Sequence, residues 1–140
     1  MKLLSAGLFL LIGCGAMNAS IIFTLGNNPQ PGEENVLFNA PGLISGPALT
    51  VTGTTQTSNF LVNFTSNENL VTPSQGQARV EAQDGAFRTL GINLGTGSFT
   101  DIIFNLNTAN ATPGTATITV TEAVGPGGTF VLPVANGRTS

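Results

Sequence analysis

The chain has 140 residues, a formal net charge of −3 and only 8% charged residues, against roughly 25% in an average soluble domain. It contains no His, Trp or Tyr, and its single cysteine is Cys14. These absences exclude imidazole bases, zinc sites built from Cys and His, and a disulfide within one chain.

Residues 1–19 are predicted to be a secretory signal peptide that contributes a short helix before the fold. Lys2 precedes an apolar stretch, Leu3–Ile12, which is too short for a bilayer span of roughly 20 residues. A buried N-terminal helix is disfavoured because no later segment has a helical period to pack against it. We expect cleavage after Ala19, so that Ser20 begins one domain over residues 20–140. The competing interpretation is a lipobox ending in Cys14, whose lipidated thiol would anchor the chain as a surface lipoprotein.

From Ser20 onward, short runs rich in Val, Ile, Thr and Phe alternate with clusters of Gly, Pro, Asn and Ser. This pattern predicts an all-β protein, an antiparallel β-sandwich of the jelly-roll or immunoglobulin-like type with about nine strands. No segment has a sustained helical period, and no 20- to 50-residue repeat is present. The expected strands cover residues 20–25, 34–39, 49–53, 58–64, 77–82, 87–94, 99–106, 115–122 and 129–134.

Side-chain alternation indicates which face of each strand is buried. In 115–122, three apolar residues should face the core and the threonines should face solvent: Ala116, Ile118 and Val120 against Thr115, Thr117, Thr119 and Thr121. Asp84-Gly85 is a hairpin-turn signal between two expected strands. The phenylalanines are expected in the core at Phe23, Phe38, Phe60, Phe64, Phe87, Phe99, Phe104 and Phe130.

Charged residues offer little chemistry. After the leader the basic residues are Arg79, Arg88 and Arg138, which excludes a nucleic-acid footprint or a polybasic membrane patch. Glu81 and Asp84 flank a turn, where carboxylates usually solubilise a strand end, so a glycosidase-type pair is disfavoured. Serine and threonine hydroxyls lack a His or a mature Lys to activate them. We therefore expect no enzymatic activity and no catalytic residue.

Calcium is the one metal that the composition permits, because it takes oxygen ligands from carboxylates, amides and carbonyls. The segment 26–35 supplies the candidate ligands Asn27, Asn28, Glu33, Glu34 and Asn35. Their spacing matches no EF-hand, and a plain polar turn is the favoured interpretation. No other cofactor is expected.

A secreted β-sandwich suggests carbohydrate binding, yet sugar-stacking sites usually need Trp or Tyr, which this chain lacks. Recognition of a polysaccharide through Asn and Thr side chains, with or without calcium, is kept as the alternative function.

Several segments carry a family resemblance, most specifically the run Ser74–Ala82 (SQGQARVEA); the others are Ile22–Asn28, Glu33–Asn39, Val51–Thr55, Phe60–Phe64, Phe99–Asn105 and Gly114–Val120. They resemble the N-terminal region of bacterial proteins that bear a PEP-CTERM sorting signal, over about residues 21–134. The resemblance implies export and exosortase processing at a surface bearing exopolysaccharide, and it supplies no catalytic residue.

The chain ends at Ala135–Ser140 without the Val-Pro-Glu-Pro-like motif, apolar helix and basic tail of that family. We expect either a truncated reading frame or a secreted relative without the anchor. A truncated sandwich would leave an open sheet edge, which favours self-association. The predicted protein is thus a secreted or cell-surface, non-enzymatic structural or interaction module whose partners are exopolysaccharide or other surface proteins, with no nucleic acid and no membrane span in the mature chain.

Overall fold

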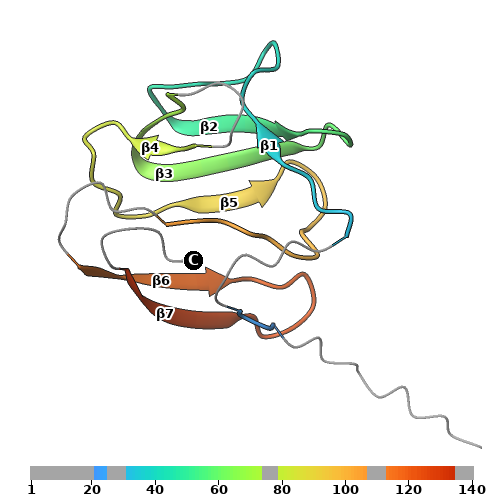
Figure 1. Cartoon of the computed structure of the whole chain (residues 1–140), viewed down its shortest axis with the longest axis vertical. Helices are drawn as coiled ribbons and strands as arrows, with labels where there is room; N and C mark the ends of the chain where they lie inside the picture. Colours follow the sequence, from blue (N-terminus) through green and yellow to red (C-terminus); the bar gives the residue numbers. More distant parts are fainter. Residues whose placement is uncertain (1–20, 25–30, 74–78, 107–112, 135–140) are drawn as a thin grey trace, which may run out of the picture.

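The computed structural model describes residues 21–24, 31–73, 79–106 and 113–134 (Figure 1). These residues contain seven β-strands and no helix. Every strand pairing is antiparallel, and the strands form one sheet of five and one sheet of two. The expected all-β class is therefore confirmed. Within these residues, no helix has the length and apolar character that crossing a bilayer would require.

The five-stranded sheet is organised around β3. Its strands are β1 (Val36–Leu37), β2 (Ala48–Thr55), β3 (Leu61–Val71), β4 (Glu81–Ala82) and β5 (Gly91–Leu94). β2 pairs with both β1 and β3, while β4 and β5 each pair with β3. β5 lies beside the first half of β3 and β4 beside its last two residues. One strand thus holds three neighbours together.

The second sheet is a hairpin of β6 (Gly114–Val120) and β7 (Gly128–Val134). Ala116, Ile118 and Val120 are half-buried, whereas the threonines between them are exposed, so the predicted faces of this strand are confirmed. On β7, Phe130 lies opposite Ile118. Its ring stacks on Phe23 with the centroids 5.1 Å apart.

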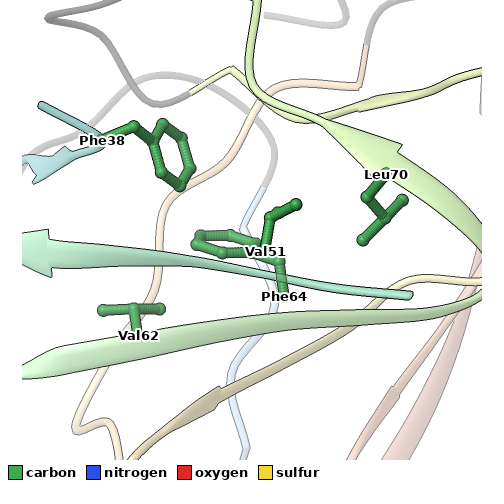
Figure 2. Close-up of a cluster of buried hydrophobic side chains, with 5 residues drawn as sticks. All are labelled: Phe38, Val51, Val62, Phe64 and Leu70. Atoms are coloured by element: carbon green, nitrogen blue, oxygen red, sulfur yellow. The ribbon is translucent and has the colours of Figure 1, made fainter. Parts of the chain in front are cut away.

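The core lies on the five-stranded sheet (Figure 2), where Phe38, Val51, Val62, Phe64 and Leu70 form one buried cluster. Val51, Val62 and Leu70 are fully shielded from solvent, each 0% exposed. Phe38 and Phe64 meet edge to face, with centroids 5.4 Å apart and rings inclined by 60°, a favourable aromatic geometry. Alternating apolar residues on β3 therefore bury one face, as strand periodicity requires.

Two further features of β2 are a buried polar side chain and a close approach by β1. Thr52 is 7% exposed. Its hydroxyl accepts a hydrogen bond from the Ile44 N–H at 2.7 Å, and its own N–H donates to the Ile44 carbonyl at 2.9 Å. At Gly53 a Cβ would lie 2.6 Å from Val36 Cγ1 and 2.9 Å from Phe38 Cε1. Only glycine leaves room there for the side chains of Val36 and Phe38 to pack against β2.

Two of the expected strands are not strands. Residues 21–24 and 99–106 have no ladder partner among the described residues, and a strand exists only through such pairing. The second segment runs back beneath β5 toward β6 (Figure 1). There Ile102, Ile103 and Phe104 remain exposed. The sequence placed an apolar run correctly but could not reveal that its backbone stays unpaired. The expectation of about nine strands is therefore not confirmed, since the described residues form seven.

Three phenylalanines expected in the core are instead exposed. Phe60, Phe87 and Phe104 have exposed fractions of 54%, 47% and 38%. Phe60 precedes β3 because residues 55–60 form a turn, in which Asn59 has a left-handed φ of 56°. Phe87 lies in a loop, since β5 begins only at Gly91. Strand phase predicts burial only within a strand.

The Asp84-Gly85 turn is present, but it does not join a simple hairpin. The Gly85 N–H donates to the Ala82 carbonyl at 2.9 Å, and Gly85 has a φ of +80°, which glycine adopts without strain. The flanking strands β4 and β5 both pair with β3 and not with each other. The expected strand 77–82 shortens to Glu81–Ala82, with residues 77 and 78 outside the described part.

Candidate functional site

The best-defined polar site of the described chain lies where the middle of β3 leaves its ladders. On one side the pairing with β2 jumps from Ala48↔Leu70 to Thr50↔Thr65. On the other side β4 pairs at Leu70 and β5 resumes at Thr65. Residues 66–69, four polar side chains in a row (SNEN), therefore lie opposite residues 83–90, which we call the 83–90 loop.

Hydrogen bonds attach the 83–90 loop to β3 at both of its ends. The Gln83 N–H donates to the Asn69 carbonyl at 2.8 Å, and Asn69 Nδ2 donates to Gln83 Oε1 at 3.1 Å. At the far end, Ser66 Oγ donates to the Thr89 carbonyl at 2.7 Å, and Thr89 Oγ1 donates to Asn67 Oδ1 at 2.9 Å. One backbone bond and three bonds that involve side chains thus connect the loop to β3 where the regular ladder is missing.

Arg88 links the carboxylates of this site. Its backbone N–H donates to Glu68 Oε1 at 2.8 Å, and its guanidinium Nη1 lies 2.7 Å from Glu68 Oε2 and 3.3 Å from Asp84 Oδ2. The Glu68 side chain is only 12% exposed, whereas those of Arg88 and Asp84 are 62% and 53% exposed. The Ala86 N–H, and secondarily Arg88, lowers the pKa of Asp84 below its usual value. The two carboxylates therefore share one arginine.

A shallow open hollow of about 250 Å³ lies beside this network, lined by Glu68, Asn69, Gln83 and Asp84. The inner groups of the two amides bond to each other. None of the hydrogen bonds between described residues uses Asn69 Oδ1 or Gln83 Nε2. The four lining residues thus carry one amide acceptor and one amide donor that this network does not use, besides the remaining lone pairs of two carboxylates.

The sequence singled out only Asp84 of these residues. Glu68, Asn69, Gln83 and Arg88 are contributed by two segments that meet only through the register shift of β3. The available signal was the uninterrupted polar run 66–69 inside an otherwise apolar-polar strand pattern. Glu81, considered with Asp84 as an acid pair, instead forms an ion pair with Arg79. The two carboxylates of that proposed pair therefore have different arginine partners.

The calcium candidates divide between a structural role and residues outside the described part. The Glu34 carboxylate accepts hydrogen bonds from the N–H groups of Thr57 and Ser58 at 2.7 and 2.8 Å and from the Ser58 hydroxyl. These bonds, the Ser58 hydroxyl foremost, lower the pKa of Glu34. Asn35 Nδ2 lies 3.5 Å from Gln56 Oε1. Glu34 and Asn35 thus fasten the turn after β2.

The other candidates do not extend this arrangement. Glu33 Oε1 is buried without a hydrogen-bond partner in the described structure, and Asn27 and Asn28 lie outside the described residues, as do Cys14, Ala19 and Ser20. In the described ranges no three His, Cys, Asp or Glu side chains gather as a metal site would require.

No protein-family model, curated protein or solved structure matches the chain. The resemblance to PEP-CTERM proteins therefore stays a hypothesis.

Proposed function

We propose that this chain is an exported, non-enzymatic protein of the cell surface or extracellular matrix, and that its β-domain acts as a structural or interaction module. The observation that carries the proposal is the solvent face of the β6–β7 sheet. Thr115, Thr117, Thr119 and Thr129 lie on it together with Val131 and Pro133, and all six are exposed. An uncharged, regular sheet face suits contact with a polymer or another protein.

The engagement of four carboxylates supports the non-enzymatic part. Glu34 fastens a turn, Glu81 pairs with Arg79, and Glu68 and Asp84 share Arg88. Each interaction holds backbone segments or neighbouring side chains in place. A general acid or base would instead need a pKa tuned toward the working pH, whereas the pKa values of Glu34 and Asp84 are lowered.

The resemblance to PEP-CTERM ectodomains and the apolar leader support export. We further infer that the two antiparallel sheets are the layers of a β-sandwich, since each has one apolar and one polar face. Self-association through sheet edges belongs to the same proposal, because β7 pairs only with β6 among the described strands. A monodisperse monomer in sedimentation velocity at high protein concentration would argue against self-association.

Fractionation of cells that express the native gene tests the location. The expected result is protein in the medium, the matrix or the outer surface, with an intact mass that corresponds to cleavage after Ala19. A mass corresponding to lipidated Cys14 would instead identify a surface lipoprotein. Full-length protein confined to the cytoplasm would contradict export.

The hollow beside β3 favours a second function, recognition of a polysaccharide. Two observations favour it: the polar lining of the hollow and the exposed ring of Phe87 in the 83–90 loop.

A further inference from the structure

We propose that the hollow formed by β3 and the 83–90 loop binds one sugar unit of a neutral polysaccharide. The inference rests on the second function above and gives it a site and a ligand class. The volume of about 250 Å³ falls just below the range of roughly 300–1,000 Å³ for pockets that enclose drug-sized ligands. A shallow opening of this size suits one ring of a polymer that continues on both sides over the surface.

Polar contacts attach the 83–90 loop to β3, and the larger apolar side chains of the loop are only partly buried. Phe87 and Leu90 are 47% and 38% exposed, so hydrophobic burial does not explain the ordering of the loop. Three sets of hydrogen bonds hold it in place: those from Arg88 to Glu68, the amide pair of Asn69 and Gln83, and the bond from the β3 serine Oγ to the Thr89 carbonyl. A loop fixed in this way loses little conformational entropy when a ligand binds.

The free groups of the hollow match the chemistry of a sugar hydroxyl. A hydroxyl donates one hydrogen bond and accepts others. Gln83 Nε2 can donate to it, while Asn69 Oδ1 can accept from it, and the inner halves of both amides keep their mutual bond of 3.1 Å. Glu68 and Asp84 can accept from neighbouring hydroxyls, since an ionised carboxylate has about four acceptor sites.

Charge and aromatic exposure narrow the ligand class. The two carboxylates in the lining and the net charge of −3 repel an anionic polymer such as alginate. Phe87 belongs to the same 83–90 loop, outside the four lining residues, and is 47% exposed, so its ring is accessible to the apolar face of a sugar that extends beyond the hollow. A neutral polymer of hexoses is therefore the expected partner.

Affinity electrophoresis of the purified full chain tests the site, with dextran, galactomannan, xyloglucan or alginate in the gel. The expected result is retardation by at least one neutral polymer and none by alginate. Gln83→Glu keeps the acceptor that Asn69 uses, replaces the Nε2 donor by a carboxylate oxygen and adds one negative charge, so it should weaken retention of a neutral polymer by about tenfold. Phe87→Ala should weaken retention by about fivefold.

Matched controls exist at the other end of the sheet. Gln56→Glu makes the same change in the exposed amide pair of Asn35 and Gln56, and Phe60→Ala removes another exposed ring. Both controls should retain wild-type binding. Should Gln83→Glu fail to fold, the comparison of Phe87→Ala with Phe60→Ala decides the question.

Several results would overturn the site: no retention by any neutral polymer, retention unchanged in both hollow variants, or equal loss in the controls. Stronger binding of alginate than of neutral polymers would overturn the ligand class. The cell fractionation described above is independent of these gels, so a failure of sugar binding is distinguishable from a failure of the export proposal.

Discussion

Leu70 offers the sharpest test of the core. It is fully buried on β3, and its ladder neighbours are both alanines, Ala48 on β2 and Ala82 on β4. Neither neighbour can fill the space that Leu70→Ala would leave. Since Leu→Ala substitutions in cores cost about 2–5 kcal/mol, depending on how far the site collapses, we expect the upper part of that range, about 3–5 kcal/mol. This is a large share of the roughly 5–15 kcal/mol that stabilises a typical domain.

Urea unfolding followed by far-UV circular dichroism measures this loss, because the chain has no Trp or Tyr for fluorescence. The dependence of free energy on urea should keep its slope in the variant, so that the shift in midpoint reports stability alone. Leu49→Ala is the control, since Leu49 also lies on β2, beside β3, but is 56% exposed. This substitution should lower the free energy of unfolding by less than about 1 kcal/mol. The reasoning fails if Leu70→Ala costs under about 1 kcal/mol, or if both variants cost the same.

Three further predictions concern the close packing at Gly53, the carboxylate of Glu34 and the absence of a structural calcium ion. Gly53→Ala should destabilise the fold by about 1–3 kcal/mol, because its Cβ would press on Val36 and Phe38. Gly114→Ala, whose Cβ meets nothing within 4 Å, should not destabilise it, and equal melting temperatures of the two variants would contradict this. The lowered pKa of Glu34 contributes stability above the ordinary carboxyl pKa of about 4.3, and this stability is lost as the pH falls through the lower folded value. Glu34→Gln should therefore melt lower at neutral pH and lose less on acidification; parallel wild-type and variant curves would refute the assignment. Because hydrogen bonds to the turn after β2 already occupy the Glu34 carboxylate, a chelator should leave the melting midpoint unchanged, and a lower midpoint would reveal a structural calcium ion.

The sequence was most informative where alternation persists along a whole strand. The pattern of β6, with Ala116 and Ile118 inward and the threonines outward, is confirmed. Phe64 is buried as predicted, while Phe60, also expected in the core, is exposed before the strand begins. Periodicity defines faces reliably, but the ends of a strand depend on the turn beside it, here the left-handed Asn59.

The candidate site was harder to predict, because it arises from a mismatch between strands. The local sequences of residues 66–69 and 83–90 do not predict that the two segments lie opposite each other. That placement follows from the register of β4 and β5 on β3, which depends on long-range pairing. The unpaired segment 99–106 shows the same limit in reverse: its composition is that of a strand, but no described neighbour completes its ladder.

The central position of β3 has a consequence for how the domain opens. Because β2, β4 and β5 all pair with this one strand, none of them can keep its full ladder once β3 detaches, and the five strands should exchange their amide protons as one cooperative unit. The β6–β7 hairpin pairs only within itself among the described strands, so its amides can exchange through a separate, lower-energy opening. The chain would then respond to mild denaturation in two stages, with the threonine face released while the hollow on β3 is still intact.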